Sequence, residues 1–301
     1  MGLLNFSNLF KKRRERKVLV IEGGGMSGIF LTGVLQSFTD QKYFPFKLIV
    51  GTSAGALSGC VYAAGQVHVA RDAFFSDSLS EHLIQLKNIF NTEKHVLDLD
   101  WMIDFFLQGP EPLNVKTLRK ACPVIITATH CPYDKPLEKK YFNSRKDDLA
   151  SVLKATAAMP FVYRGFVEYK NYKLLDGGTL DPIPFYKALE MGYKDEDILV
   201  LATKPKGYRQ KQESLLVRIL IDKYYNDPGH RNIVNELNKH HIKYNMILDD
   251  MEYNHPNIEV IYPPEDFDVD RLTTDMKKII EGFQQGVMAG NKYMNPERYA
   301  T

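Results

Sequence analysis

The chain of 301 residues contains only three cysteines, Cys60, Cys122 and Cys131. Three thiols cannot form a disulfide framework for a chain of this length. Cys60 and Cys122 lie within apolar runs, so we expect buried free thiols in a reducing compartment. The sequence has no Cys-x-x-Cys pair and no paired Cys and His spacing, so it predicts no metal site.

The sequence also lacks any run of about 18 apolar residues, which argues against a transmembrane helix. The apolar residues at the N-terminus precede its positive charges, and no small-residue cleavage site follows, which argues against a signal peptide. Gly2 does not predict myristoylation, because Phe6 stands where that motif has Ser or Thr. We therefore expect a cytoplasmic protein.

Neither sign of charge dominates, since 39 basic residues face 37 acidic ones. We expect no nucleic-acid partner. One local excess stands out, because five apolar and six basic residues crowd into residues 1–17. They are Leu3, Leu4, Phe6, Leu9 and Phe10, then Lys11, Lys12, Arg13, Arg14, Arg16 and Lys17. This tail is either a solvated terminus or a peripheral contact with the inner face of an anionic membrane.

From Lys17 onwards, short apolar runs rich in β-branched residues alternate with helical patterns. Strands are predicted at 18–21, 47–50, 124–128 and 198–202, and helices at 28–40, 54–64 and 147–159. The stretch 66–120 is predicted to be mostly helical, 139–142 to pair near the third strand, and 165–175 to form a hairpin that turns near Asn171. This order predicts an α/β fold, a three-layer α/β/α arrangement with a mainly parallel central sheet and helices on both faces.

The composition changes after Pro205, which suggests three segments. Residues 1–16 are predicted to be a basic tail, 17–205 the α/β domain, and 206–301 a mostly helical extension packed on the core. Within the extension we expect helices over 206–253 and 268–290 and a strand near 257–262. The sequence does not decide whether this extension is a lid or completes the fold.

A glycine loop, Gly23-Gly24-Gly25-Met26-Ser27-Gly28, separates the first predicted strand from the first predicted helix. Glycines allow positive φ and close backbone approach. The N–H groups that begin the following helix suit an anion. Alone, the loop is compatible with a dinucleotide fingerprint, a phosphate cradle or an oxyanion hole. It is not a Walker A loop, because no Gly-Lys-Ser/Thr ends it.

A second motif, Gly51-Thr52-Ser53-Ala54-Gly55, again lies between a strand and a helix. This is G-x-S-x-G in the context of a nucleophile elbow, whose glycines here are Gly51 and Gly55. The sharp turn lifts the Ser53 hydroxyl off the end of the sheet. It also points the N–H of Ala54 at the place where an oxyanion would form. We predict that Ser53 is a nucleophile.

A third motif, Asp176-Gly177-Gly178, ends an apolar run. By itself it indicates a turn after a strand. Together with the other two motifs, Asp176 becomes a candidate general base.

The three motifs in this order resemble the patatin-like phospholipase family, whose hallmarks are G-G-G-x-[KR]-G, G-x-S-x-G and D-G-[AG]. Residues 155–161 resemble the family's small-residue helix that ends in Pro-Phe. Residues 175–184 resemble the strand and loop around its catalytic acid. The resemblance covers about residues 17–205 and implies a patatin-like fold.

The resemblance also implies a serine acyl hydrolase that cleaves carboxylic esters of lipids without a cofactor. Ser53 and Asp176 would form a catalytic dyad, and the reaction would pass through an acyl-enzyme. Backbone N–H groups of the glycine loop (Gly23, Gly24, Gly25, Gly28) and of Ala54 would form the oxyanion hole. Gly177 and Gly178 would belong to the acid motif. The substrate would be a lipid or a small ester; the oligomeric state stays open.

This chain departs from the family pattern at Ser27, where the family usually carries Lys or Arg. A cation beside the oxyanion hole favours negative charge on the substrate or transition state. The resemblance therefore does not carry over a preference for anionic headgroups.

The main mechanistic alternative is a Ser-His-Asp triad, in which a histidine should follow Asp176 in the sequence. The candidates are His230, His240, His241 and His255. None follows a core strand, and His240 and His241 stand in a charged helix, where a solvated surface role is expected. The earlier histidines, His68, His82, His95 and His130, are expected to be structural or exposed.

Two other functions remain as alternatives. A nicotinamide-dependent enzyme would need an acid at the end of the second strand, but that strand ends in the Ser53 motif. A non-catalytic or weakly active lipid-binding protein on the same fold is the other alternative, and Ser27 is the reason to keep it.

Overall fold

The computed structural model describes residues 16–76, 82–88 and 94–299. Its strands are β1 Val18–Ile21, β2 Leu48–Thr52, β3 Val124–His130, β4 Glu138–Asn143, β5 Val167–Tyr169, β6 Tyr172–Asp176, β7 Ile198–Leu201 and β8 Glu259–Ile261. Its longer helices are α1 Gly28–Asp40, α2 Ala54–Ala63, α3 Val67–Phe75, α4 Leu99–Gln108, α5 Val115–Lys120, α6 Leu149–Ala157, α7 Phe185–Glu190, α8 Leu215–Tyr224, α9 Arg231–Tyr253 and α10 Met276–Met294.

All eight strands belong to one sheet, in the order β5-β6-β3-β2-β1-β7-β8, with β4 also paired to β3. The pairs β1–β2, β2–β3, β1–β7 and β7–β8 are parallel. The pairs that involve β4, β5 or β6 are antiparallel. The predicted mainly parallel α/β sheet is confirmed, and its antiparallel strands make it mixed.

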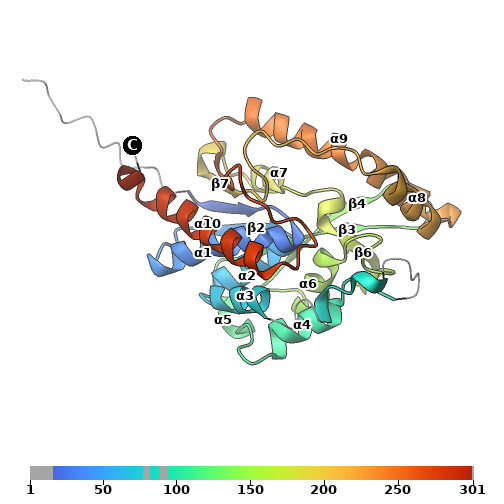
Figure 1. Cartoon of the computed structure of the whole chain (residues 1–301), viewed down its shortest axis with the longest axis horizontal. Coiled ribbons are helices and arrows are strands. Elements are labelled where there is room, and N and C mark those ends of the chain that lie inside the picture. The colour runs from blue at the N-terminus through green and yellow to red at the C-terminus, as the bar shows by residue number, and fades with distance from the viewer. Residues whose placement is uncertain (1–15, 77–81, 89–93, 300–301) are drawn as a thin grey trace, which may run out of the picture.

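The two faces of the sheet are covered by different helices (Figure 1). Alternate residues of β1 enter separate cores because side chains of a strand point to opposite faces. Leu19 and Ile21 pack with residues of α1, α2 and α6, whereas Val18 and Val20 pack with residues of α7 and α9. All four residues are fully buried. A strand buried on both faces is apolar throughout, which is why its sequence does not alternate.

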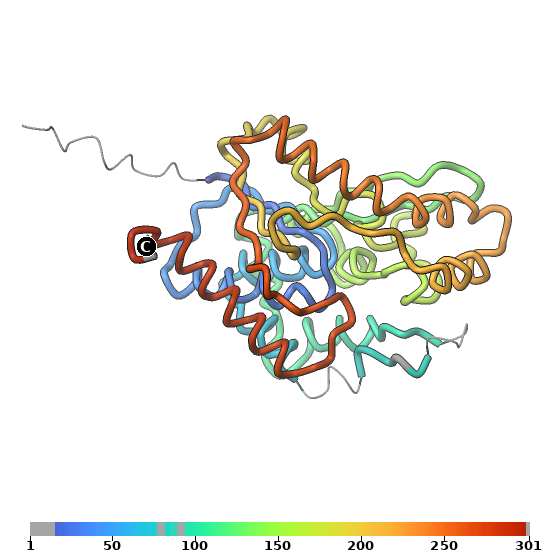
Figure 2. Tube along the Cα trace, turned by 45° about the horizontal axis from the view of Figure 1, so that its top comes forward, coloured from blue at the N-terminus to red at the C-terminus, as the bar shows by residue number. Residues whose placement is uncertain are grey.

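The C-terminal third wraps around this sheet (Figure 2). It runs along one side as α8 and α9, adds β8 to the edge of the sheet beside β7, and returns on the other side as α10 against α1. None of the described helices is long and apolar enough to cross a bilayer. All three cysteines are free; Cys60 and Cys131 are buried and Cys122 is half-buried.

The last helix begins later than its sequence pattern predicts. We expected a helix from residue 268, but α10 starts at Met276. The side chain of Asp275 accepts hydrogen bonds from the N–H groups of Lys277 and Lys278, so it caps the helix at that point. Residues 262–275 are irregular instead. The stretch 206–214 is likewise not helical.

The start of the described chain is tied to the sheet. Arg16 forms an ion pair with Glu259 at 3.1 Å, and Lys17 forms one with Asp197 at 2.9 Å. Most of the predicted basic tail, residues 1–15, lies outside the described residues.

Candidate active site

Ser53 sits at a sharp turn between β2 and α2. Its backbone has φ 53° and ψ −128°, a conformation that non-glycine residues rarely adopt. Its N–H donates to Thr156 Oγ1 at 2.8 Å. A side chain at Gly55 would place its Cβ 2.5 Å from the carbonyl oxygens of Ile21 and Glu22. Only glycine therefore lets α2 start this close to the end of β1, as expected for an elbow.

The sheet register brings Asp176 to Ser53. Thr127 of β3 pairs with Thr52 of β2, and the next residue, Ala128, pairs with Asp176 of β6. Strand β4 pairs along one edge of β3. On the opposite edge β2 pairs with β3 as far as Thr127, and β6 pairs with β3 from Ala128 onwards. The last residue of β6 therefore lies beside the residue that follows β2. The Ser53 hydroxyl lies close enough to the Asp176 carboxylate to lower the pKa of that group.

Burial changes the basicity of this acid. Asp176 is 7% exposed, and desolvation raises the pKa of its carboxyl group from its ordinary value to about 6. Three groups oppose the rise: the Ser53 hydroxyl, the N–H of Gly178, which donates to Asp176 Oδ1 at 2.6 Å, and the charge of Arg271. A carboxylate with a pKa near 6 is a stronger base than an exposed one and is still ionised at neutral pH.

Three backbone N–H groups of the predicted oxyanion hole have no hydrogen-bond partner among the described residues: those of Gly24, Gly25 and Ala54. The N–H of Gly23 donates to Pro182 O at 3.1 Å, which ties the loop down. The N–H of Gly28 bonds within the turn that begins α1.

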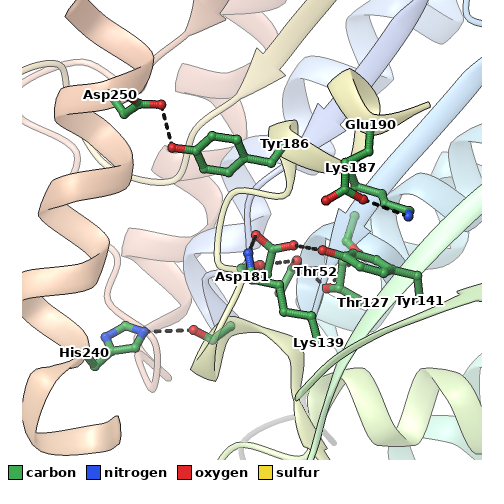
Figure 3. A network of polar contacts seen from close by, with 12 residues as sticks. Thr52, Thr127, Lys139, Tyr141, Asp181, Tyr186, Lys187, Glu190, His240 and Asp250 are labelled. Atoms are coloured by element: carbon green, nitrogen blue, oxygen red, sulfur yellow. Dashed lines mark hydrogen bonds and ion pairs between the residues drawn. The ribbon is translucent and has the colours of Figure 1, made fainter. Parts of the chain in front are cut away.

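A polar network around Asp181 fixes the segment that contains Pro182, the partner of Gly23 (Figure 3). The buried carboxylate of Asp181 accepts from Tyr141 Oη at 2.7 Å and from Lys139 Nζ at 3.1 Å. Its backbone carbonyl accepts from Thr52 Oγ1 at 2.8 Å. Asp181, the residue before Pro182, is thus bonded both to β4 and to the end of β2.

His240 of α9, for which the sequence predicted a solvated surface role, lies against the acid motif. His240 Nε2 lies 2.9 Å from the carbonyl oxygen of Gly178 and donates to it (Figure 3). Burial lowers the pKa of His240 to about 4, with the charge of Arg271 as the next cause, so the ring is neutral at pH 7. The prediction of a solvated role is therefore wrong for His240, whose ring faces the acid motif. The helical pattern of residues 206–253 does not indicate which of its side chains contact the acid motif.

The other histidine candidates make contacts different from that of His240. His255 is engaged with Asp195 at 3.0 Å. His241 lines the cavity described below. In the described part of the chain no hydrogen bond joins a histidine to Ser53 or to the Asp176 carboxylate.

Ser53 and Asp176 open into a cavity of about 390 Å³. One region of it is apolar, with Leu83, Met102, Phe105 and Phe106 from α4 and the segment before it. The C-terminal third contributes polar side chains, among them Gln210, Glu213 and Arg271. Among the described residues no group of three or more His, Cys, Asp or Glu side chains is arranged to hold a metal ion.

The chain is similar to known proteins over most of its length. It is 26% identical over 282 residues to the uncharacterized protein YjjU of Escherichia coli strain K12, covering 93% of this chain and 77% of that protein. The solved structure of VipD from Legionella pneumophila shares the fold, with a TM-score of 0.51 at 12% identity over 94% of this chain and 67% of that chain.

Two family profiles match the sequence. Residues 230–297 match a domain of unknown function, which corresponds to most of the C-terminal third. Residues 19–189, more than half of the chain, match the patatin-like phospholipase family and include all three motifs of the site. The chain therefore belongs to the patatin-like phospholipase family.

Proposed function

We propose that this protein is a serine acyl hydrolase that cleaves carboxylic esters of lipids with a Ser53–Asp176 dyad. The observation that carries the proposal is that the sheet register brings these two side chains together at the wall of one largely apolar cavity. Beside them lie three backbone N–H groups without partners among the described residues, those of Gly24, Gly25 and Ala54.

In the first half of the reaction, Ser53 Oγ attacks the ester carbonyl carbon while Asp176 takes the hydroxyl proton. The tetrahedral oxyanion accepts hydrogen bonds from the free N–H groups of the glycine loop and Ala54. The carbon–oxygen bond to the alcohol then breaks, and the alcohol leaves with the proton from Asp176. An acyl-enzyme on Ser53 remains.

In the second half, water attacks the acyl carbonyl and gives a proton to Asp176. The bond to Ser53 Oγ breaks, the oxygen recovers its proton from Asp176, and a fatty acid is released. Asp176 thus acts as base and acid in turn, which its pKa of about 6 suits. Its neighbour His240 is neutral and bonds to Gly178, so it supports the turn without taking the proton.

The lining of the cavity favours an amphiphilic substrate. An acyl chain fits the apolar region around Phe105 and Phe106, and a polar head fits the region around Gln210 and Arg271. We also propose the division into a tail (1–16), a catalytic domain (17–205) and a C-terminal extension (206–301) that completes this cavity.

The test is an ester and lipid panel run with the wild type, Ser53→Ala and Asp176→Asn. Both variants should lose activity by about a thousandfold or more, since each removes a group that acts in every turnover. Ser151→Ala, which changes a serine on α6 outside the cavity, is the matched control.

A fluorophosphonate probe gives a second readout, because it should label Ser53 in the wild type and leave Ser53→Ala unlabelled. Retained hydrolysis in Asp176→Asn would redirect the search for the base to the histidines. An inert wild type over the whole panel would favour the lipid-binding alternative.

A further inference from the structure

The irregular segment before α10 runs along the glycine loop. Ser27 Oγ donates to the carbonyl oxygen of Val269 at 2.6 Å, and the N–H of Met26 donates to that of Arg271 at 3.1 Å. Ser27 is fully buried. A long cationic side chain at position 27 would have no space beside Val269, so the short serine is what admits this segment.

Arg271 thereby lies directly against the loop. Gly25 has φ 56°, and a Cβ on it would lie 2.6 Å from the Arg271 carbonyl oxygen. The backbone of Arg271 is thus packed against Gly25, one of the residues whose N–H has no partner among the described residues. Residue 271 is more than 200 positions away from this loop in the sequence, yet it borders the same cavity as Ser53 and Asp176.

The positive charge of Arg271 affects the pKa values of three groups around the site. It opposes the effect of burial on the pKa of Asp176 and of Glu22, and it adds to the effect of burial on the pKa of His240. In the described ranges no ion pair of Arg271 occurs. The Glu22 carboxylate is already occupied by Tyr244 Oη at 2.5 Å and the N–H of Thr203 at 2.6 Å. The guanidinium donors therefore have no hydrogen-bond partner among the described residues.

We propose that Arg271 forms a subsite for the phosphate of an acyl glycerophosphate, beside the ester that Ser53 attacks. The glycine loop of this chain has Ser27 where the family usually carries a cation. Arg271, from the C-terminal third, supplies a cation beside that loop instead. A guanidinium binds phosphate oxygens with two parallel hydrogen bonds, which gives it both strength and direction. This inference rests on the proposed function and names its substrate class.

The direct test is binding to Ser53→Ala, in which no turnover occurs. Trp101 is the only tryptophan of the chain and lines the cavity, so its fluorescence reports on ligands there. Dodecyl phosphate should bind about tenfold or more tighter than 1-O-dodecylglycerol, which has a neutral head on the same chain. Adding Arg271→Gln should abolish this difference, and Arg271→Lys should keep part of it. Lys277→Gln, on an exposed lysine of α10, is the control for a lost positive charge.

Turnover provides a second arm with the otherwise wild-type chain. Arg271→Gln should raise KM for a lysophosphatidic acid by about tenfold or more, and by much less for a monoacylglycerol of the same chain length. Circular dichroism checks that each variant is folded. Equal affinity of Ser53→Ala for both dodecyl ligands, or an equal loss for both in Arg271→Gln, would overturn the subsite. A wild type without hydrolysis would overturn the proposed function alone, because the binding arm does not depend on it.

Discussion

At the scale of single residues, the ionisation of Asp176 controls the proposed chemistry. The carboxylate is buried, and its contacts only partly offset the cost of burying charge, which leaves its pKa at about 6. His240 has a pKa of about 4 and is neutral over the same range. The two groups therefore titrate apart, and a pH profile can tell them from one another.

We expect kcat/KM for a soluble ester to fall as the pH drops through about 6. The sign follows from the role of Asp176, which must be deprotonated to take the proton of Ser53. Arg271 lowers the pKa of Asp176, so Arg271→Gln should move this acid limb to higher pH. The measurement is a profile from about pH 4.5 to 9. A rate that is flat between about pH 5 and 8 would contradict the assigned base.

The hydrogen bond from His240 to Gly178 predicts a positioning role. His240→Phe removes the donor and leaves the Gly178 carbonyl unsatisfied, which should cost about 1–3 kcal/mol of stability. Because the N–H of the same residue binds Asp176, we also expect kcat to fall by about tenfold.

His240→Gln is the matched variant, since a glutamine amide can donate from nearly the same place. Most of the lost kcat should return with it, while the acid limb near pH 6 stays in position. If Phe and Gln reduced kcat equally, the hydrogen bond would have no part in positioning the acid.

At the scale of elements, α10 holds the C-terminal third on the rest of the fold by a very close crossing with α1. Gly282, Gly286 and Gly290 recur every four residues on α10, and they face Ile29, Phe30, Gly33 and Ser37 of α1. A Cβ at Gly286 would lie 2.2 Å from the Phe30 carbonyl oxygen. Residues at this spacing share one face of a helix, and without side chains the two backbones can touch.

Gly286→Ala should therefore destabilise the protein despite the better helix propensity of alanine. Propensity alone would favour the variant by about 1 kcal/mol. The clash is with backbone and cannot be relieved by a side-chain rotation, so we expect a net loss of about 1–3 kcal/mol. Urea unfolding measures it, with Gln284→Ala on the exposed face of the same helix as the control. A gain in stability would show that the two helices move apart at little cost.

At the scale of the whole molecule, the basic tail predicts a peripheral contact with an anionic membrane, and the basic residues that are not bound to the fold would make it. Arg16 and Lys17 are bound to Glu259 and Asp197, so they belong to the folded core. The remaining basic residues, Lys11, Lys12, Arg13 and Arg14, and the apolar residues before them lie outside the described residues.

Deletion of residues 2–14 should lower binding to anionic vesicles, by about 1 kcal/mol for each basic residue that lies near the surface. Hydrolysis of a soluble ester should change little, because Arg16 keeps its contacts. Cosedimentation with vesicles of phosphatidylserine and phosphatidylcholine measures the effect, and neutral vesicles are the control. Unchanged binding to the anionic vesicles would remove the tail from the membrane contact.

Much of the fold could be read from local pattern. The first strand and the first helix have their predicted bounds, because the apolar run and the helical period that predict them extend over only a few positions. The start of α10 was misplaced, since the apolar pattern continued through residues that Asp275 excludes from the helix. The prediction of a hairpin over 165–175 agrees with β5 and β6. The sequence did not predict that β6 pairs with β3 on the same edge as β2.

The sequence by itself determined the family, the nucleophile candidate and the acid candidate, because each lies in a short motif whose geometry is local. Only the tertiary structure decided that His240 bonds to the acid motif and that Arg271 borders the glycine loop. These contacts join residues 62 and more than 200 positions apart. No local periodicity encodes such pairs, since they arise only when the C-terminal third packs on the core.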